Sequence, residues 1–380
     1  MLDQNKDHQN WLRCDADTGL EVNPATAFPH EHVRSKQIGE GAEGTVETWR
    51  HKPSDLVIAV KVNHGLTSPG KLPVEVDILK SLPAHHAIIN CFAYLPRQET
   101  LGGDCIFYEY CPGGDMFDFM VDMLETNKMI FSGAFLWNVY AQLASAMAFL
   151  HEGVGCADTT VEHSWRPVAH RDIKPENIFI ASRGSKDDFS DMTFKLGDFG
   201  LSAFYDPDNA RVPGTWGTTM YWPPEQTWEE RRGLPEGDIW AIGSIIHRLC
   251  HGYLPMQDPE VFERLSMRDQ KIRKPPFHLL EVFWACKAPR KPIPINLSSD
   301  QQEEYKDERR WRPTPRYSDA LNECMMMALK LQMKERATGA ELKRHVDQAH
   351  AAFMFEELSL DDGALRGERD VQGSTECLQP

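Results

Sequence analysis

The sequence predicts an α+β protein in which strands dominate up to about residue 109 and helices dominate after it. Residues 56–61 and 105–110 are short apolar runs rich in β-branched or aromatic residues, which is typical of buried strands. Residues 135–151 place apolar side chains at helical spacing, which indicates a long buried helix. A chain of 380 residues is long enough for two or three average domains or for one large unit of two lobes.

The chain begins with a polar stretch, residues 1–30, which we expect to be a flexible extension. A glycine-rich run follows it and contains Gly39, Gly41 and Gly44. Glycines let backbone amides approach phosphate oxygens that a Cβ atom would block. Many glycine-rich turns bind nothing, so this run indicates a phosphate site only together with other motifs.

The strand at residues 56–61 ends in Lys61, which presents one cation. Taken alone, this lysine is most simply a solvated strand end. Because it follows a glycine-rich loop, it becomes a candidate for pairing with the α- and β-phosphates of a nucleotide.

Residues 73–80 have the pattern of a helix that carries two acids, Glu75 and Asp77. Its expected apolar face consists of Val74, Ile78 and Leu79. Glu75 precedes Ile78 by three residues and Leu79 by four, whereas Asp77 lies two residues further round the helix, so both acids are candidate partners of Lys61. The alternative is that both carboxylates are solvated.

Residues 170–177 place an aspartate, a lysine and an asparagine at short, fixed spacing. Asp172 can orient a substrate hydroxyl and accept its proton, and Lys174 can neutralise charge on a moving phosphoryl group. Asn177 can hold a metal ion through its side-chain oxygen. A second metal ligand is expected at Asp198, which begins an Asp-Phe-Gly run 26 residues after Asp172.

These motifs, in this order, resemble the eukaryotic protein kinase family, and Lys174 resembles its serine/threonine branch. Residues 217–225 resemble the end of an activation segment, and residues 238–243 resemble the start of the αF helix. The resemblance covers roughly residues 32–350. It implies the bilobal protein-kinase fold, with a small antiparallel β-sheet lobe that contains the αC helix and a larger, mostly helical lobe.

The resemblance implies ATP and Mg²⁺ as cofactors and gives each candidate residue a role. The catalytic groups would be Asp172, Lys174, Lys61 and Glu75. The metal ligands would be Asn177 and Asp198. The nucleotide site would comprise Gly39, Gly41, Gly44, Val46, Ala59, Lys61, Tyr108, Glu109, Cys111, Asp115 and Phe179.

Within that nucleotide site, the resemblance makes Tyr108 the gatekeeper that closes the pocket behind the adenine. Glu109 and Cys111 would bind the adenine through backbone groups. Asp115 would meet the ribose hydroxyls, with helix N-capping as an equally good alternative. The adenine ring would lie between Val46, Ala59 and Phe179.

The resemblance also implies contacts on the acceptor side of the site. Glu225 would form a buried structural ion pair with Arg336, and Asp238 would brace the backbone of the catalytic loop. Arg171 would grip a phosphate on the activation segment, for which Thr215 is the best-placed acceptor. The alternative is that this segment is ordered without a phosphate.

The expected organisation is one protein kinase domain over residues 31–352, followed by a disordered acidic tail at 353–380. The domain divides into a small lobe, 31–109, and a large lobe, 110–352, with insertions near 153–168 and 254–315. The second insertion carries aromatic residues that suit a docking partner, although packing onto the lobe is the simpler interpretation.

The amino-acid composition limits the classes of partner that the protein is expected to bind. The chain has 41 basic and 57 acidic residues, and its net charge of −16 argues against nucleic-acid binding. The sequence contains no apolar run of about 18 residues, so we expect no membrane-spanning helix. The nine scattered cysteines indicate reduced thiols in a cytoplasmic or nuclear protein. The expected partners are ATP and a protein substrate with a serine or threonine acceptor.

The sequence therefore predicts an ATP-dependent serine/threonine protein kinase that transfers the γ-phosphoryl group of Mg-ATP to protein hydroxyls. One alternative is a pseudokinase scaffold, but such proteins usually lose the strand lysine, the catalytic aspartate or the metal aspartate, and this chain keeps all three. A small-molecule kinase of related fold is a second alternative, disfavoured because such proteins lack a segment like residues 217–225.

Overall fold

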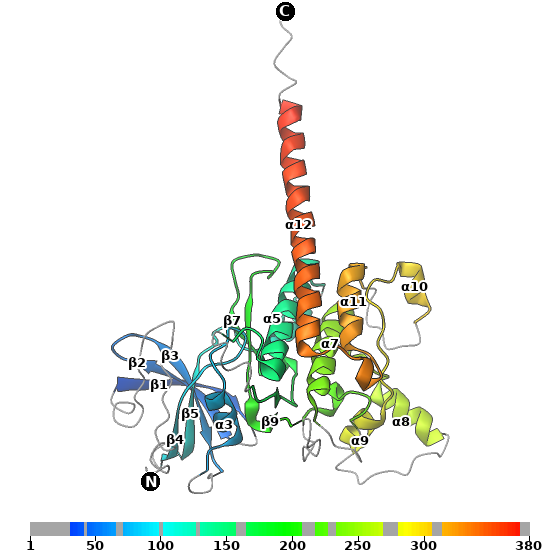
Figure 1. Cartoon of the computed structure of the whole chain (residues 1–380). Helices are drawn as coiled ribbons and strands as arrows, with labels where there is room; N and C mark the ends of the chain where they lie inside the picture. The colour runs from blue at the N-terminus through cyan, green and yellow to red at the C-terminus, as the bar shows by residue number, and fades with distance from the viewer. Residues whose placement is uncertain are drawn as a thin grey trace, which may run out of the picture.

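The protein, a computed structural model, consists of a small β-sheet lobe and a larger helical lobe (Figure 1). The structure describes residues 31–372 except 42–43, 66–70, 99–101, 127–129, 157–164, 207–216, 227–232, 269–279 and 306–313. The predicted N-terminal extension, residues 1–30, lies outside the described residues.

The small lobe is a five-stranded antiparallel sheet in the order β1-β2-β3-β5-β4. Its strands are β1 (His32–Glu40), β2 (Gly44–His51), β3 (Val57–Asn63), β4 (Cys91–Gln98) and β5 (Gly103–Glu109). Successive side chains of a strand point to opposite faces. One apolar cluster of this sheet includes Ile58, Val60, Phe92 and Phe107. The predicted α+β fold with an antiparallel small lobe is confirmed.

The helix of the small lobe, α3 (Val74–Ser81), turns a different face inward from the one the sequence predicted. Its buried residues are Glu75, Val76, Ile78 and Leu79. The prediction for Val74 was wrong, because its side chain is 51% exposed. Each residue turns the helix by about 100°, so the buried set is centred well away from Val74 and opposite the exposed Asp77.

The large lobe is built around α5 (Gly133–Glu152), which Ser132 caps and which ends where Gly153 adopts a φ of 74°. Among the described residues, α5 is the one helix long and apolar enough to span a membrane by length and composition. However, 72% of that window is buried inside the protein, so α5 serves as the core helix of the lobe. Helix α7 (Pro235–His251) packs against it.

The other elements of the large lobe surround these two helices. The helices are α4 (Met116–Glu125), α8 (Pro259–Arg268), α9 (Leu280–Lys287), α10 (Ser299–Glu303) and α11 (Asp319–Ala328). The strand pairs are β6 (Val168–Ala169) with β9 (Ala203–Phe204), and β7 (Ile178–Ser182) with β8 (Thr193–Leu196). The short 3₁₀ turns include η1 (Pro175–Asn177), η2 (Phe199–Leu201) and η4 (Thr219–Tyr221).

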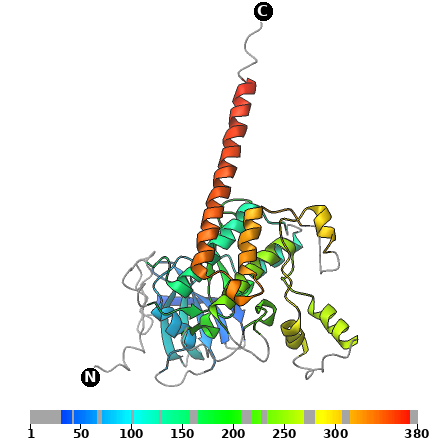
Figure 2. The same ribbon diagram turned by 45° about the vertical axis from the view of Figure 1, so that its right-hand side comes forward.

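The last helix, α12 (Gly339–Gln372), packs on α5 at its start and then projects beyond the lobe (Figures 1 and 2). Trp137 of α5 stacks on His350 with ring centroids 6.0 Å apart. The sequence predicted a disordered tail from residue 353; the structure continues α12 as far as Gln372, and residues 373–380 lie outside the described part. Extending a helix that has already formed requires no new nucleation.

The buried His85 makes the stability of the fold dependent on pH. Its ring stacks on Phe149 of α5 with centroids 4.3 Å apart, and its Nδ1 accepts a hydrogen bond from the Ala87 amide. Burial, with smaller contributions from His86 and two lysines, lowers the pKa of His85 from 6.5 to about 3. The folded protein therefore leaves this ring neutral at a pH where the unfolded chain protonates it.

We predict that the free energy of unfolding falls as the pH drops from 7 towards 4, and that His85→Asn reduces this slope. Between pH 6.5 and about 3 only the unfolded state binds the proton, so one such histidine contributes about 1.4 kcal/mol per pH unit. Asparagine keeps an acceptor for the Ala87 amide but does not titrate. Urea unfolding at several pH values measures both slopes, and equal slopes would contradict the prediction.

Candidate active site

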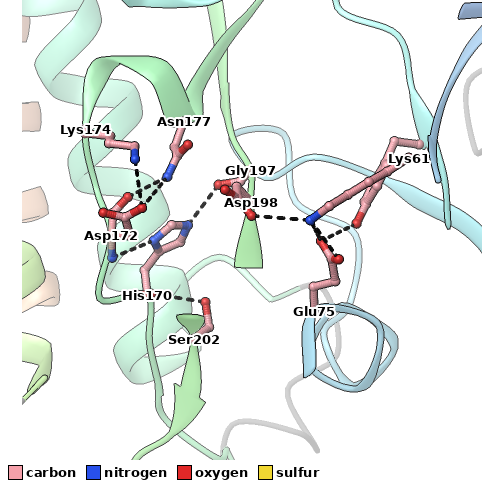
Figure 3. Close-up of polar contacts among 10 residues, drawn as sticks. Lys61, Glu75, His170, Asp172, Lys174, Asn177, Gly197, Asp198 and Ser202 are labelled. Atoms are coloured by element: carbon pink, nitrogen blue, oxygen red, sulfur yellow. Dashed lines mark hydrogen bonds and ion pairs between the residues drawn. The ribbon is translucent and has the colours of Figure 1, made fainter. Parts of the chain in front are cut away.

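The cation on β3 and the acid on α3 form the ion pair that the sequence predicted. Lys61 Nζ donates to Glu75 Oε1 at 2.9 Å and to Oε2 at 3.1 Å (Figure 3). Glu75 is 3% exposed, whereas Asp77 is exposed. Glu75 is thus the partner of Lys61.

Helix α7 holds the start of the loop at residues 170–177 through Asp238. Asp238 accepts hydrogen bonds from the backbone amides of His170 at 2.7 Å and Arg171 at 2.8 Å. Its Oδ2 also lies 3.1 Å from His151 Nε2. The bracing role expected for Asp238 therefore has its geometry, and Arg171 adopts a φ of 73° directly before Asp172.

Four donors surround the carboxylate of Asp172. Its Oδ1 accepts from the Thr218 amide at 2.9 Å and from Thr218 Oγ1 at 3.0 Å. Its Oδ2 lies 3.1 Å from Lys174 Nζ and 3.2 Å from Asn177 Nδ2 (Figure 3). Lys174 Nζ also donates to Thr218 Oγ1 at 3.2 Å. The structure thus brings together the predicted catalytic residues of the loop and fixes the direction of the carboxylate.

Asn177 and Asp198 have the chemistry expected of a Mg²⁺ site. Within the described residues, both side-chain hydrogen bonds of Asn177 come from its Nδ2, to the backbone oxygen and the side chain of Asp172, so Oδ1 is left as an acceptor. The side chain of Asp198 is 45% exposed and lies 3.7 Å from Lys61 Nζ. Mg²⁺ in proteins is commonly held by one or two oxygen ligands together with substrate phosphates, so these residues fit that ion.

The three glycines at the end of β1, between the strands and at the start of β2 have different constraints. A Cβ on Gly44 would lie 1.9 Å from the backbone oxygen of Val62, so only glycine allows β2 to approach β3 there. A Cβ on Gly41 would meet nothing within 4 Å, and one on Gly39 would touch Val46 at 3.5 Å. Gly44 is therefore required by the sheet, while Gly41 leaves open space beside the loop.

The end of β5, directly before the hinge between the lobes at residues 111–114, makes a contact that sequence reasoning missed. Glu109 Oε1 lies 2.8 Å from Lys195 Nζ of β8 and accepts from the Asn90 amide at 2.7 Å. Lys195 lies three residues before Asp198, but nothing in the sequence pairs it with a residue in the other lobe. Burial, and next the Glu109 carboxylate, raise the pKa of the Cys111 thiol to about 12, so it stays neutral.

The remaining nucleotide candidates lie on β2, β3, β5 and β7 and at the N-cap of α4. Val46 and Phe179 are half-buried, Ala59 is paired with Tyr108 across β3 and β5, and the ring of Phe179 packs on Gly197. Asp115 caps α4 by accepting from the Asp118 amide at 2.8 Å. Asp115 thus has the capping geometry, and its contact with a ribose stays a prediction.

The acceptor side is anchored by the predicted ion pair of Glu225 with Arg336. The two guanidinium nitrogens meet the two carboxylate oxygens at 2.7 and 3.0 Å. Arg336 also donates to the backbone oxygens of Glu236 and Lys330. Its side chain is 0% exposed and that of Glu225 is 24% exposed, so burial is complete only on the arginine side.

Arg290, in the 254–315 insertion, is a second anchor that the sequence did not reveal. It donates to the backbone oxygens of Trp222 at 2.8 Å and Thr219 at 2.9 Å, next to the Thr218 that contacts Asp172. It also binds two backbone oxygens at the end of α9, those of Ala285 and Ala288. Burial lowers the pKa of Arg290 to about 10, so it stays cationic at neutral pH.

Other predictions on the large lobe have mixed outcomes. Thr215 lies outside the described residues, so its contact with Arg171 stays a prediction. In the first insertion, residues 157–164 are likewise outside, and Trp165 donates to the backbone oxygen of Leu150 at 3.1 Å. In the second insertion Trp284 is 2% exposed, so this aromatic packs onto the lobe.

Comparison with known proteins identifies the class that this fold and this site define. The model of the protein kinase domain family matches residues 32–346. The chain therefore belongs to the protein kinase family, and it resembles the family's serine/threonine members.

Two relatives illustrate that likeness. The serine/threonine-protein kinase Nek1 of Toxoplasma gondii is 32% identical over 241 residues, which are 61% of this chain and 14% of that protein. The G2-specific protein kinase nimA of Emericella nidulans is 29% identical over 271 residues, 66% of this chain and 36% of that protein. The chain thus spans well under half the length of these relatives.

Solved structures show the same fold. A chain of the CAK complex of Chaetomium thermophilum bound to ATP-γ-S superimposes with a TM-score of 0.58 at 20% identity. The match covers 84% of this chain and 91% of that chain. At this identity the likeness supports the architecture alone.

We predict that Arg290→Met raises the KM for a protein acceptor while leaving the KM for ATP unchanged. The guanidinium holds the backbone next to Thr218, and hydrogen bonds to charged groups contribute about 1.5–3 kcal/mol each, so we expect an increase of about tenfold or more. Steady-state kinetics with each substrate varied in turn measures both constants.

The matched control is Arg316→Met, which removes an arginine whose side chain is 63% exposed. A variant that merely unfolds in part would lose kcat without a change in KM. If Arg290→Met behaves like that, or like the control, the role given to Arg290 is wrong.

Proposed function

We propose that this chain is an active Mg-ATP-dependent kinase that transfers the γ-phosphoryl group to serine or threonine hydroxyls of proteins. Its membership of the protein kinase family supports this proposal. The observation that carries it is the carboxylate of Asp172, oriented by Thr218 on one oxygen and by Lys174 and Asn177 on the other. A phosphotransferase needs a base in that fixed position.

The proposed reaction begins with acceptor binding at Asp172. An ionised carboxylate offers about four lone-pair positions, and Thr218, Lys174 and Asn177 occupy them. The acceptor hydroxyl must therefore displace one donor. Lys174 is the group best able to leave, because its side chain is 22% exposed. In moving towards the phosphoryl group it would free Oδ2 for the hydroxyl proton and stabilise the developing charge.

The nucleotide side of the proposal rests on the small lobe. Lys61, held by Glu75, would bind the α- and β-phosphates. Mg²⁺, held by Asn177 and Asp198, would neutralise charge on the β- and γ-phosphates when bound. The half-buried Val46, Cys111, Asp115 and Phe179 would line the nucleoside site, with the backbone of Glu109 and Cys111 reading the adenine.

The proposed partners are ATP and a protein substrate. A docking partner on the 254–315 insertion stays a proposal, supported by partly exposed apolar side chains at Leu265, Met267 and Val282. The acidic net charge supports the expectation that nucleic acid is not a partner. A cytoplasmic or nuclear location is likewise proposed, from the cysteine usage.

We predict that Asp172→Asn lowers phosphoryl transfer by roughly 10²–10⁴-fold, the usual contribution of a general base. Asparagine keeps the size of the side chain but cannot accept the hydroxyl proton. The measurement is transfer of labelled γ-phosphate to a generic protein substrate, together with ATP affinity by calorimetry. ATP affinity should be nearly unchanged.

The matched control is Asp187→Asn, which makes the same change at an exposed position between β7 and β8. Equal turnover by wild type and Asp172→Asn would point to a contaminating kinase and overturn the proposal. A wild-type protein that binds ATP but shows no turnover would instead support the pseudokinase scaffold.

A further inference from the structure

Tyr108 makes a direct contact with the ion pair that orients Lys61. Its hydroxyl donates to Glu75 Oε2 at 2.7 Å. The same oxygen accepts from Lys61 Nζ at 3.1 Å, while Oε1 accepts from Lys61 at 2.9 Å. The carboxylate of Glu75 is therefore held from two directions, by an ammonium group on β3 and by a phenol on β5.

The register of the sheet explains why these side chains meet. Ala59 of β3 pairs with Tyr108 of β5, and Lys61 pairs with Ile106. Residues two apart on a strand share a face, so all four side chains point to the same side of the sheet. Diagonal neighbours across antiparallel strands lie within reach of long side chains, and α3 lays Glu75 over this part of the sheet.

Burial makes the second donor important. Glu75 is 3% exposed, and a buried carboxylate requires hydrogen-bond donors in place of the water it has lost. Burial, and next the charge of Glu75, raise the pKa of Tyr108 well above its ordinary value, so the phenol stays protonated and remains a donor. A hydrogen bond from a neutral donor to an ionised acceptor is stronger than one between neutral groups.

We propose that Tyr108 is a positioning residue for phosphoryl transfer, because its hydroxyl fixes Glu75 and, through Glu75, the direction of Lys61. This inference rests on the proposed function and goes beyond a role for Tyr108 as a wall of the adenine pocket. It ties α3 to the last residues of β5, directly before the hinge. Through Glu75, α3 is then bonded to the end of β5 next to the hinge as well as to β3.

The test is Tyr108→Phe, which removes one oxygen and leaves the ring. We expect kcat/KM for ATP to fall about tenfold or more, since a hydrogen bond to a charged group is lost. Tyr94→Phe is the matched control, because it also removes a phenol hydroxyl that donates to a buried carboxylate of the same lobe, that of Asp104 at 3.0 Å. The control should keep wild-type kcat/KM.

A double-mutant cycle with Glu75→Gln separates positioning from general packing. If Tyr108 acts through Glu75, Tyr108→Phe adds little to the effect of Glu75→Gln. Additive effects of the two substitutions would overturn the proposal. So would a Tyr108→Phe protein with the same kcat/KM as Tyr94→Phe.

Amide hydrogen exchange of α3 provides a readout that does not depend on turnover. Exchange at residues 74–81 should be faster in Tyr108→Phe than in wild type and in Tyr94→Phe. If wild type shows no turnover but exchange responds in this way, the proposed function fails while the hold of Tyr108 on Glu75 stands. If wild type turns over and neither kinetics nor exchange responds to Tyr108→Phe, only the role of Tyr108 is wrong.

Discussion

The buried carboxylate of Asp238 is the constraint on which the geometry of the site depends. It accepts the amides of His170 and Arg171 at 2.7 and 2.8 Å, and these bonds hold Arg171 in the left-handed region at a φ of 73°. Such a conformation costs a non-glycine residue on the order of 1–3 kcal/mol. Two charge-assisted hydrogen bonds in a buried setting offset it. Because Asp172 is the next residue, α7 positions the backbone that carries the carboxylate proposed as the base.

The acceptor segment is fixed to the same lobe by two buried arginines that use different chemistry. Arg336 pairs with a carboxylate, Glu225, and adds backbone oxygens. The hydrogen bonds of Arg290 within the described chain go to backbone oxygens alone, two of them at the C-terminal end of α9, where the helix dipole favours a cation. Arg290 binds main chain directly beside Thr218, whereas Arg336 acts through the side chain of Glu225. The contact of Thr218 with Asp172 therefore has support that does not involve a phosphate on the activation segment.

The parts of the site that sequence reasoning predicted are those where residue type and spacing carry the chemistry. Lys61 with Glu75, and Glu225 with Arg336, follow from motifs whose order along the chain is informative. The contact of Tyr108 with Glu75 depends instead on which face of β5 meets which turn of α3.

Arg290 and Lys195 were missed for a related reason. Each is an ordinary basic residue in the sequence, and only folding brings it to partners about 70 to 86 residues away. At α12 composition argued for disorder, but local composition does not measure the advantage of extending a helix that is already packed on α5. The prediction that Val74 is buried was wrong because a helix of eight residues has too few turns for periodicity to identify its buried face.

The two halves of the site are each ordered within their own lobe. Lys61, Glu75 and Tyr108 are joined in the small lobe, whereas Asp172, Asn177 and Asp198 belong to the large lobe. The lobes are linked behind the site, where the amide of Ile89 donates to the backbone oxygen of Leu196 at 2.9 Å.

Lys195 and Glu109 add an ion pair between the lobes near the hinge. The strand that leads into Asp198 is therefore tied both to the loop after α3 and to the end of β5. A nucleotide bound between the lobes would not need to create the geometry of either half. Its phosphates would contact Lys61 directly and Asp198 through Mg²⁺, and these two side chains already lie 3.7 Å apart. Binding energy would then be available to set the distance between two preformed halves.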